Sequence, residues 1–102
     1  MIVFNTTYHA DNARKEEFIE WLKAVYIPAV LEHGALQAPR LTRIFAEDES
    51  EGTSLSLQFN SPDTDTLQRW HRECGESLLD DMRERFGNQV LGFSTLLEVI
   101  DL

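Results

Sequence analysis

The order of its apolar segments constrains the fold of this 102-residue chain more than any other feature. Some segments alternate with the two-residue period of a β-strand, and others carry apolar residues at the three- and four-residue spacing of an amphipathic helix. They follow one another as strand, helix, strand, strand, helix, strand. Few topologies accommodate that order within one domain, because connections between elements are short and do not cross.

Four segments are expected to form strands: Ile2 to His9, Leu36 to Glu47, Thr53 to Asn60 and Gln89 to Ile100. Thr53 to Asn60 shows the clearest alternation, with three large apolar residues on one face and polar residues on the other. Only a short acidic turn separates it from the preceding strand, which predicts an antiparallel hairpin. Pro39 indicates an edge position or an irregular start for that preceding strand.

The first helix is expected to begin at a side-chain cap supplied by Asp11 or Asn12 and to end at Gly34. Pro28 lacks an amide hydrogen, so the helix should kink or restart near Ile27. Its inward-facing apolar stripe consists of Phe18, Trp21, Leu22, Val25, Ala29 and Val30.

The second helix is predicted to start at Ser61-Pro62-Asp63, with serine as the cap and proline in the first helical position, and to end at Gly87. Its apolar stripe consists of Leu67, Trp70, Cys74, Leu78, Met82 and Phe86. Together, the segments predict one domain over residues 1–102: an α+β, ferredoxin-like βαββαβ fold with a four-stranded antiparallel sheet and both helices on one face.

The last strand is apolar on both faces, with Leu91, Phe93, Leu97 and Val99 on one and Val90, Leu96 and Ile100 on the other. Two helices cover only one face of a four-stranded sheet, so a second apolar face calls for another layer. A strand of this length is also about twice as long as most. We therefore expect a homodimer in which two sheets pack face to face, without assigning which face forms the interface.

Composition narrows the possible partners. The net charge of -9, from 18 acidic and 9 basic residues, disfavours nucleic acid and anionic membrane surfaces. No apolar stretch approaches the length of a membrane span, and no secretory signal precedes the first strand. With a single cysteine in addition, a cytoplasmic location is the expectation.

The chain also resembles, almost from end to end, the small bacterial family known as domain of unknown function 4286 (DUF4286). The resemblance lies in the joint order and spacing of several blocks: Asn5-Thr6-Thr7, Trp21-Leu22 with Tyr26-Ile27-Pro28, Arg40-Leu41 with Arg43, Ser56-Leu57-Gln58-Phe59, Phe86-Gly87 and Gly92 to Ile100. It implies a ferredoxin-like dimeric α+β barrel. It brings no established activity and no catalytic residues.

Trp21 and Trp70 fall on the two helix stripes, where core packing is the ordinary interpretation. Alternatively, their rings line a pocket between helices and sheet. His71 and Cys74 lie one helical turn apart, but a structural zinc site needs four ligands, and no third group is available to orient a nucleophilic pair. We therefore expect no metal and no cofactor.

Polar side chains occupy alternating positions of the predicted strands: Asn5, Thr7, Ser54, Ser56 and Gln58. Arg43 and Thr95 or Glu98 are expected to join one of the sheet faces that carry this polar set. If a partner sheet covers it, its groups need mutual hydrogen bonds or water, because an unpaired buried polar group costs about 1–3 kcal/mol. The structural interpretation is an interface network in which Arg43 pairs with Glu98. The functional alternative is a cavity for a small polar ligand.

Two functions remain open. The first is a non-catalytic dimeric module that binds a small molecule or a protein, and the second is a cofactor-independent enzyme of the monooxygenase or isomerase kind. For the enzyme, the catalytic candidates are His71 or Glu98 as proton acceptor and Arg43 as anion stabiliser. The candidate ligand-binding residues are Trp21, Tyr26, Arg43, Gln58, Trp70 and His71.

Overall fold

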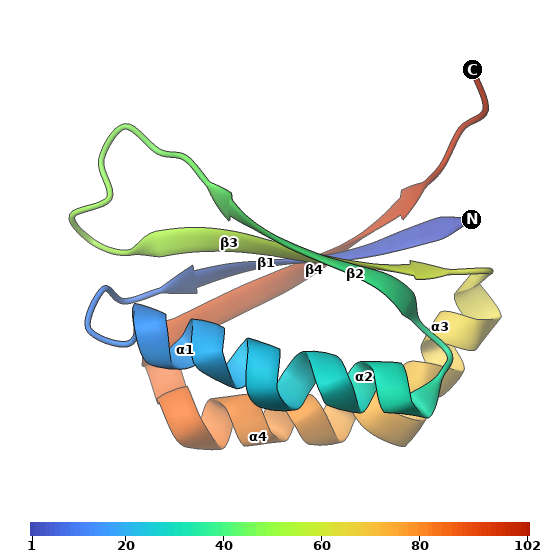
Figure 1. Cartoon of the computed structure of the whole chain (residues 1–102), viewed down its shortest axis with the longest axis horizontal. Coiled ribbons are helices and arrows are strands. Elements are labelled where there is room, and N and C mark those ends of the chain that lie inside the picture. The colour runs from blue at the N-terminus through green and yellow to red at the C-terminus, as the bar shows by residue number, and fades with distance from the viewer.

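The fold consists of one antiparallel sheet and two helical segments, both packed on the same face of the sheet. The computed structural model describes all residues, 1–102. The strands are β1 (Ile2–Ala10), β2 (Gln37–Ile44), β3 (Thr53–Ser61) and β4 (Val90–Glu98), in the spatial order β2-β3-β1-β4. Figure 1 shows that the helices cover one face of this sheet, which leaves the other face open.

Each βαβ half contains a helix in which a π-helical turn separates two α-helical pieces. The first half has α1 (Lys15–Trp21), the π segment η1 (Leu22–Tyr26) and α2 (Ile27–His33). The second has α3 (Thr64–Trp70), the π segment η2 (His71–Gly75) and α4 (Glu76–Phe86), followed by the short 3-10 turn η3 (Gly87–Gln89). None of these helices is both long enough and apolar enough to cross a lipid bilayer.

The element order and the topology confirm the expected ferredoxin-like α+β fold. β2 and β3 form the antiparallel hairpin, and β2 is an edge strand. The expected irregularity near Pro39 is a register shift between Gln37 and Arg40, where Ala38 has a φ of 56°. A proline is tolerated at such a position because an edge strand leaves part of its backbone unpaired.

β4 is shorter than predicted, since its ladder ends at Glu98 instead of Ile100. Its partner β1 begins at Ile2, so the strand has no further residues with which to pair; the last link is the Val99 amide, which donates to the Met1 carbonyl over 3.0 Å. The predicted alternation of β4 is nevertheless present. Val90 is buried beneath the helices, whereas the other large apolar side chains of this strand are exposed in the isolated chain.

The first helix differs from the expected stripe because of η1. Phe18, Leu22, Tyr26 and Val30 are buried at four-residue spacing, with Trp21 buried beside them, and Val25 is 38% exposed. Four residues exceed one α-helical turn by about 40°, so repeated four-residue steps would leave the sheet-facing side unless the helix is locally underwound. The π turn supplies that underwinding. The expected interruption before Pro28 is confirmed, since α2 begins at Ile27.

The second helix was expected to be continuous and is not. No proline lies within it, but Gly75, a poor helix former, ends η2. Its inward residues again follow four-residue steps from Trp70 to Phe86, with Cys74 and Leu78 half-buried and Met82 buried. Both halves therefore combine a seven-residue α-helix ending in tryptophan with a five-residue π turn.

Both predicted helix caps were wrong. α1 starts after Arg14 without a side-chain cap, because Asn12 instead donates to the Glu49 carbonyl over 2.8 Å and so fixes the β2–β3 loop. α3 is capped by Asp63, whose Oδ1 accepts from the Thr66 amide over 2.7 Å. Ser61 cannot cap because it is still the last residue of β3. Gly34 ends α2 in the left-handed conformation, as expected, with a φ of 91°.

Candidate functional site

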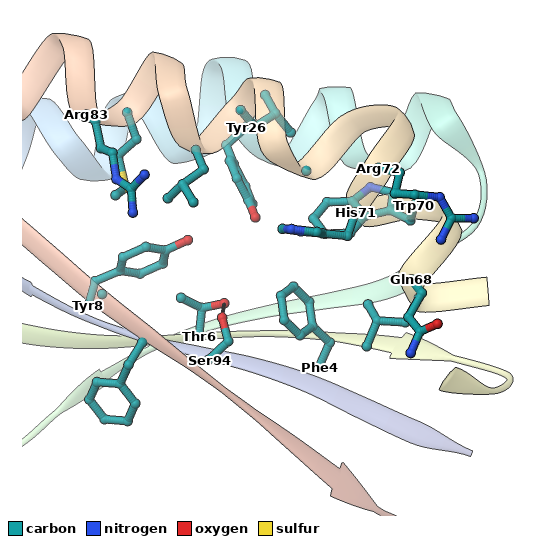
Figure 2. A pocket seen from close by; sticks show the side chains of 17 residues that line it. Phe4, Thr6, Tyr8, Tyr26, Gln68, Trp70, His71, Arg72, Arg83 and Ser94 are labelled. Carbon is teal, nitrogen blue, oxygen red and sulfur yellow. Dashed lines mark hydrogen bonds between the residues drawn. The ribbon is translucent and has the colours of Figure 1, made fainter. Parts of the chain in front are cut away.

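A cleft of about 510 Å³ lies between the helix-facing side of β1 and β4 and the helices α3, η2 and α4. Tyr26, the last residue of η1, closes the cleft from the first helical segment. The cleft is within the size range of small-molecule sites, which is about 300–1,000 Å³. Figure 2 shows its lining residues. They are Phe4, Thr6, Tyr8, Tyr26, Leu67, Gln68, Trp70, His71, Arg72, Gly75, Leu78, Leu79, Met82, Arg83, Gly92, Phe93 and Ser94.

The centre of the cleft is polar. Thr6 and Ser94, opposite each other on β1 and β4, share a hydrogen bond of 3.1 Å between their hydroxyl groups. In Figure 2, the hydroxyl groups of Tyr8 and Tyr26 and the imidazole of His71 point into the same space. Thr6, Tyr8 and Tyr26 are buried, and the hydroxyl group of each can both donate and accept a hydrogen bond. The arrangement therefore offers several hydrogen bonds to one bound molecule.

Both tyrosines remain neutral across the physiological range. Burial raises the pKa of Tyr8 to about 12, although the hydroxyls of Tyr26 and Thr6 lower it in part. Burial also raises the pKa of Tyr26 well above its usual value, and the nearby Tyr8 raises it further. Because the phenols are protonated at neutral pH, each can donate a hydrogen bond to an acceptor in the cleft.

Apolar side chains and two glycines form the walls. The rings of Phe4 and Trp70 meet edge to face with their centroids 5.6 Å apart. Gly75 allows Trp70 to pack against the helix backbone, since a Cβ there would lie 2.8 Å from Cζ3 of the indole. Gly92 plays the same part for Tyr8 on β4. The two glycines thus fix the positions of two aromatic rings that bound the cleft.

The rim carries positive charge. Arg72 and Arg83 line the cleft, and neither belongs to an ion pair, whereas four other arginines do. His71 Nε2 lies 3.8 Å from Oε1 of Glu76. No aspartate or glutamate is among the lining residues.

The structure brings together only half of the candidate ligand-binding residues. Tyr26, Trp70 and His71 line the cleft. Trp21 is 5% exposed and packs instead in the aromatic core between Phe18, Tyr26 and Phe86. This is the core-packing role that its place on the helix stripe indicated.

Arg43 and Gln58 lie away from the cleft. Arg43 is on the edge strand β2, where its guanidinium lies 4.9 Å from the centre of the Phe45 ring and 3.8 Å from the Glu49 carboxylate. Gln58 is on the open face of the sheet, opposite Asn5 and Arg40. The three catalytic candidates are separated as well, because Arg43 and Glu98 occupy opposite edges of the sheet and only His71 reaches the cleft.

The predicted polar face is present, with two corrections. Asn5, Thr7, Ser54, Ser56 and Gln58 share the open face, and Thr95 joins them opposite Asn5. Arg43 and Glu98 are on the helix-facing side, opposite Leu55 and Ile2, so they lie off the polar face on which they were expected to pair across an interface. The side chain of Asn5 links this face by accepting from Ser56 and donating to Thr7.

Cys74 is half-buried next to the cleft but does not line it. Burial raises the pKa of its thiol, and the Trp70 side chain lowers it only in part. The thiol is therefore less ionised at neutral pH than an exposed cysteine and is poorly suited to act as a nucleophile. No group of three histidine, cysteine, aspartate or glutamate side chains lies close enough together to hold a metal ion.

Sequence reasoning missed most of this site. Tyr8, Arg72 and Arg83 line the cleft, yet none of them is among the residues that the sequence indicates as candidates. The available signal was the four-residue spacing of the inward positions, which indicates π turns. Such turns are frequent at functional sites.

A family model confirms the relationship that the sequence suggested. Residues 1–100 match the model described as "Domain of unknown function (DUF4286)", and the chain belongs to this family. No curated protein sequence matches the chain.

Several crystal structures share the fold over nearly the whole chain. A protein of the "ethyl tert-butyl ether d (ethd) family" from Bacillus halodurans has a TM-score of 0.73 at 20% identity, over 98% of this chain and 100% of that one. A candidate antibiotic biosynthesis monooxygenase from Deinococcus radiodurans has a TM-score of 0.68 at 14% identity, over 100% and 95%. A dimeric ferredoxin-like protein from an uncultured marine organism has a TM-score of 0.71 at 10% identity, over 100% and 97%. At these identities, the likeness establishes the fold and not an activity.

Proposed function

We propose that this protein is a homodimeric module that binds a small molecule in the cleft between α3, η2, α4 and the strands β1 and β4. The observation that carries the proposal is the convergence of polar groups within apolar walls. Hydroxyl groups from β1, β4 and η1 and the imidazole from η2 point into one space of about 510 Å³. An apolar pocket with a few convergent polar groups is the usual form of a small-molecule site.

The homodimer is supported by the surface of β4. Leu91, Phe93 and Leu97 are 60%, 65% and 41% exposed and share the open face of the sheet with the hydrogen-bonded polar set around Asn5. A second copy laid on this face would remove these side chains from water and enclose the polar set. The similarity to dimeric ferredoxin-like proteins agrees with such an arrangement.

The test compares two serine-to-phenylalanine variants in a thermal-shift screen of a diverse small-molecule library. Ser94→Phe places a ring in the cleft, whereas Ser77→Phe places the same ring on the exposed surface of α4. Compounds that raise the melting temperature of the wild-type protein should lose this effect in Ser94→Phe and keep it in Ser77→Phe. Equal shifts in both variants would place binding outside the cleft and refute the proposal.

A cofactor-independent enzyme of the monooxygenase or isomerase kind is the second candidate. The observation that favours it is His71, whose imidazole reaches the polar centre next to two neutral phenols, so that a proton acceptor and two donors surround one space. Mass spectrometry of cleft-bound compounds incubated with protein in air tests it. Conversion that is lost in His71→Gln while binding persists would establish the enzyme; unchanged compounds favour the binding module.

A further inference from the structure

The charge of the cleft is opposite to that of the protein. The whole chain carries 18 acidic and 9 basic residues, yet Arg72, Arg83 and His71 are the only residues with basic side chains in the cleft lining, and no acidic residue accompanies them. A region of positive potential in an acidic protein favours an anionic ligand and repels cations.

The two cleft arginines are also free to bind. Of the seven arginines, Arg14, Arg43, Arg69 and Arg85 have carboxylate partners. The three without such a partner are Arg40, Arg72 and Arg83, and only Arg40 lies outside the cleft. An unpaired guanidinium can offer its planar pair of N–H donors to a carboxylate.

Arg83 is the better placed of the two. Eleven residues separate it from Arg72, which corresponds to about 16 Å along a helix, so the two cannot hold the same small anion. Figure 2 shows the Arg83 guanidinium directed from α4 toward Tyr8, while that of Arg72 is directed toward Gln68, at the opposite end of the cleft. Tyr8 and Tyr26 supply neutral phenol donors close to the Arg83 end.

We propose that the ligand is an apolar organic molecule with a single carboxylate, which Arg83 binds with the help of the Tyr8 hydroxyl. The body of the ligand contacts the apolar wall formed by Leu79, Met82 and Phe4. A carboxylate fits better than a phosphate dianion, because one guanidinium neutralises one charge and the surrounding protein is strongly acidic. This inference rests on the proposed binding function of the cleft.

The test uses matched pairs of a carboxylate and the neutral alcohol of the same shape: 2-naphthoate with 2-naphthalenemethanol, and octanoate with 1-octanol. Isothermal titration calorimetry at low salt should show that wild-type protein binds each carboxylate about tenfold more tightly than its alcohol, which is the low end for a hydrogen-bonded charged group. Arg83→Gln should reduce this ratio to about one and leave the affinity for the alcohols unchanged.

Arg40→Gln is the matched control, since it removes the same charge from an unpaired arginine outside the cleft. It should preserve the carboxylate preference. An equal loss in Arg40→Gln and Arg83→Gln would show that net charge, and not the cleft, creates the preference, and would overturn the inference. Alcohols bound as tightly as carboxylates in the wild type would also overturn it but leave the binding function intact. Failure of all four probes to bind would overturn the inference, while the library screen would still decide the binding function.

Discussion

The ring of Tyr8 packs directly on the backbone of Gly92, so that a Cβ at Gly92 would lie 2.9 Å from Cδ1 of the tyrosine. The two residues face each other across the antiparallel pair of β1 and β4. Only glycine leaves room for the ring to lie flat against the neighbouring strand. The position of the Tyr8 hydroxyl in the cleft therefore depends on the absence of a side chain on β4.

Replacing Gly92 with alanine should displace the Tyr8 ring and weaken binding in the cleft. Because the ring has to move by several tenths of an ångström, we expect an affinity loss of about tenfold for any cleft ligand, equivalent to about 1.4 kcal/mol. Calorimetric titration measures it. Thr95→Ala, on the opposite face of the same strand, serves as the control and should bind normally. An unchanged affinity in Gly92→Ala would refute this dependence.

The two tyrosines predict how stability depends on alkaline pH. Tyr8 has its pKa raised from 10.0 to about 12, and that of Tyr26 is raised as well. Above pH 10 the unfolded chain loses phenolic protons that the folded chain retains, so the unfolded state binds fewer protons and stability falls as pH rises. The stabilising contribution is complete below about pH 10 and declines toward pH 12, by about 1.4 kcal/mol per pH unit for each tyrosine.

Urea unfolding between pH 9 and 12 tests this decline, and Tyr8→Phe should roughly halve the tyrosine contribution to its slope. The chain has only these 2 tyrosines, so the absorbance of tyrosinate reports both groups directly. We expect little tyrosinate until the protein unfolds. Ionisation near pH 10 in the folded state would contradict the burial of the two hydroxyl groups.

Gly75→Ala offers a test in which the sign of the effect is informative. In an open helical position, alanine stabilises relative to glycine by about 0.5–1 kcal/mol. At Gly75, the new Cβ would lie 2.8 Å from Trp70 and 3.1 Å from Nδ1 of His71, so we expect a loss of about 1–3 kcal/mol in the free energy of unfolding. Chemical denaturation measures it. A gain in stability would show that the π turn does not hold Trp70 as closely as described.

Much of the fold follows from local sequence patterns. Thr53 to Asn60 has a period of two that survives in the structure as strict alternation of buried and half-buried residues, and its turn to β2 is short enough to dictate the hairpin. The helices were placed correctly for the same reason. Their N-terminal caps were not, because Asn12 and Ser61 found other hydrogen-bond partners, and such competition is decided by tertiary contacts.

The site was harder to predict than the fold. An α-helical period puts Val25 on the inward stripe and Tyr26 beside it, whereas with the π turn Val25 is 38% exposed and Tyr26 is buried and lines the cleft. The neighbours of Arg83 in sequence are mostly charged, which is the local pattern of a solvated helix face. The proximity of Arg83 to Tyr8 arises from the packing of α4 over β1, a contact between segments more than 70 residues apart that no local pattern encodes.

The homodimer has a sharp test in a pair of leucines with nearly equal exposure. Leu97, on the open face of β4, is 41% exposed, and Leu31, on α2 in the helical layer, is 43% exposed. A second copy on the open face buries Leu97 but not Leu31. Leu97→Glu would place an unpaired carboxylate in the interface at a cost of at least about 3 kcal/mol, which corresponds to a dissociation constant raised about 100-fold. Sedimentation at micromolar concentration should therefore give a dimer for the wild type and Leu31→Glu and a monomer for Leu97→Glu. A dimer in all three would move the interface away from β4, because no sheet-to-sheet packing on the open face could accommodate that charge without loss.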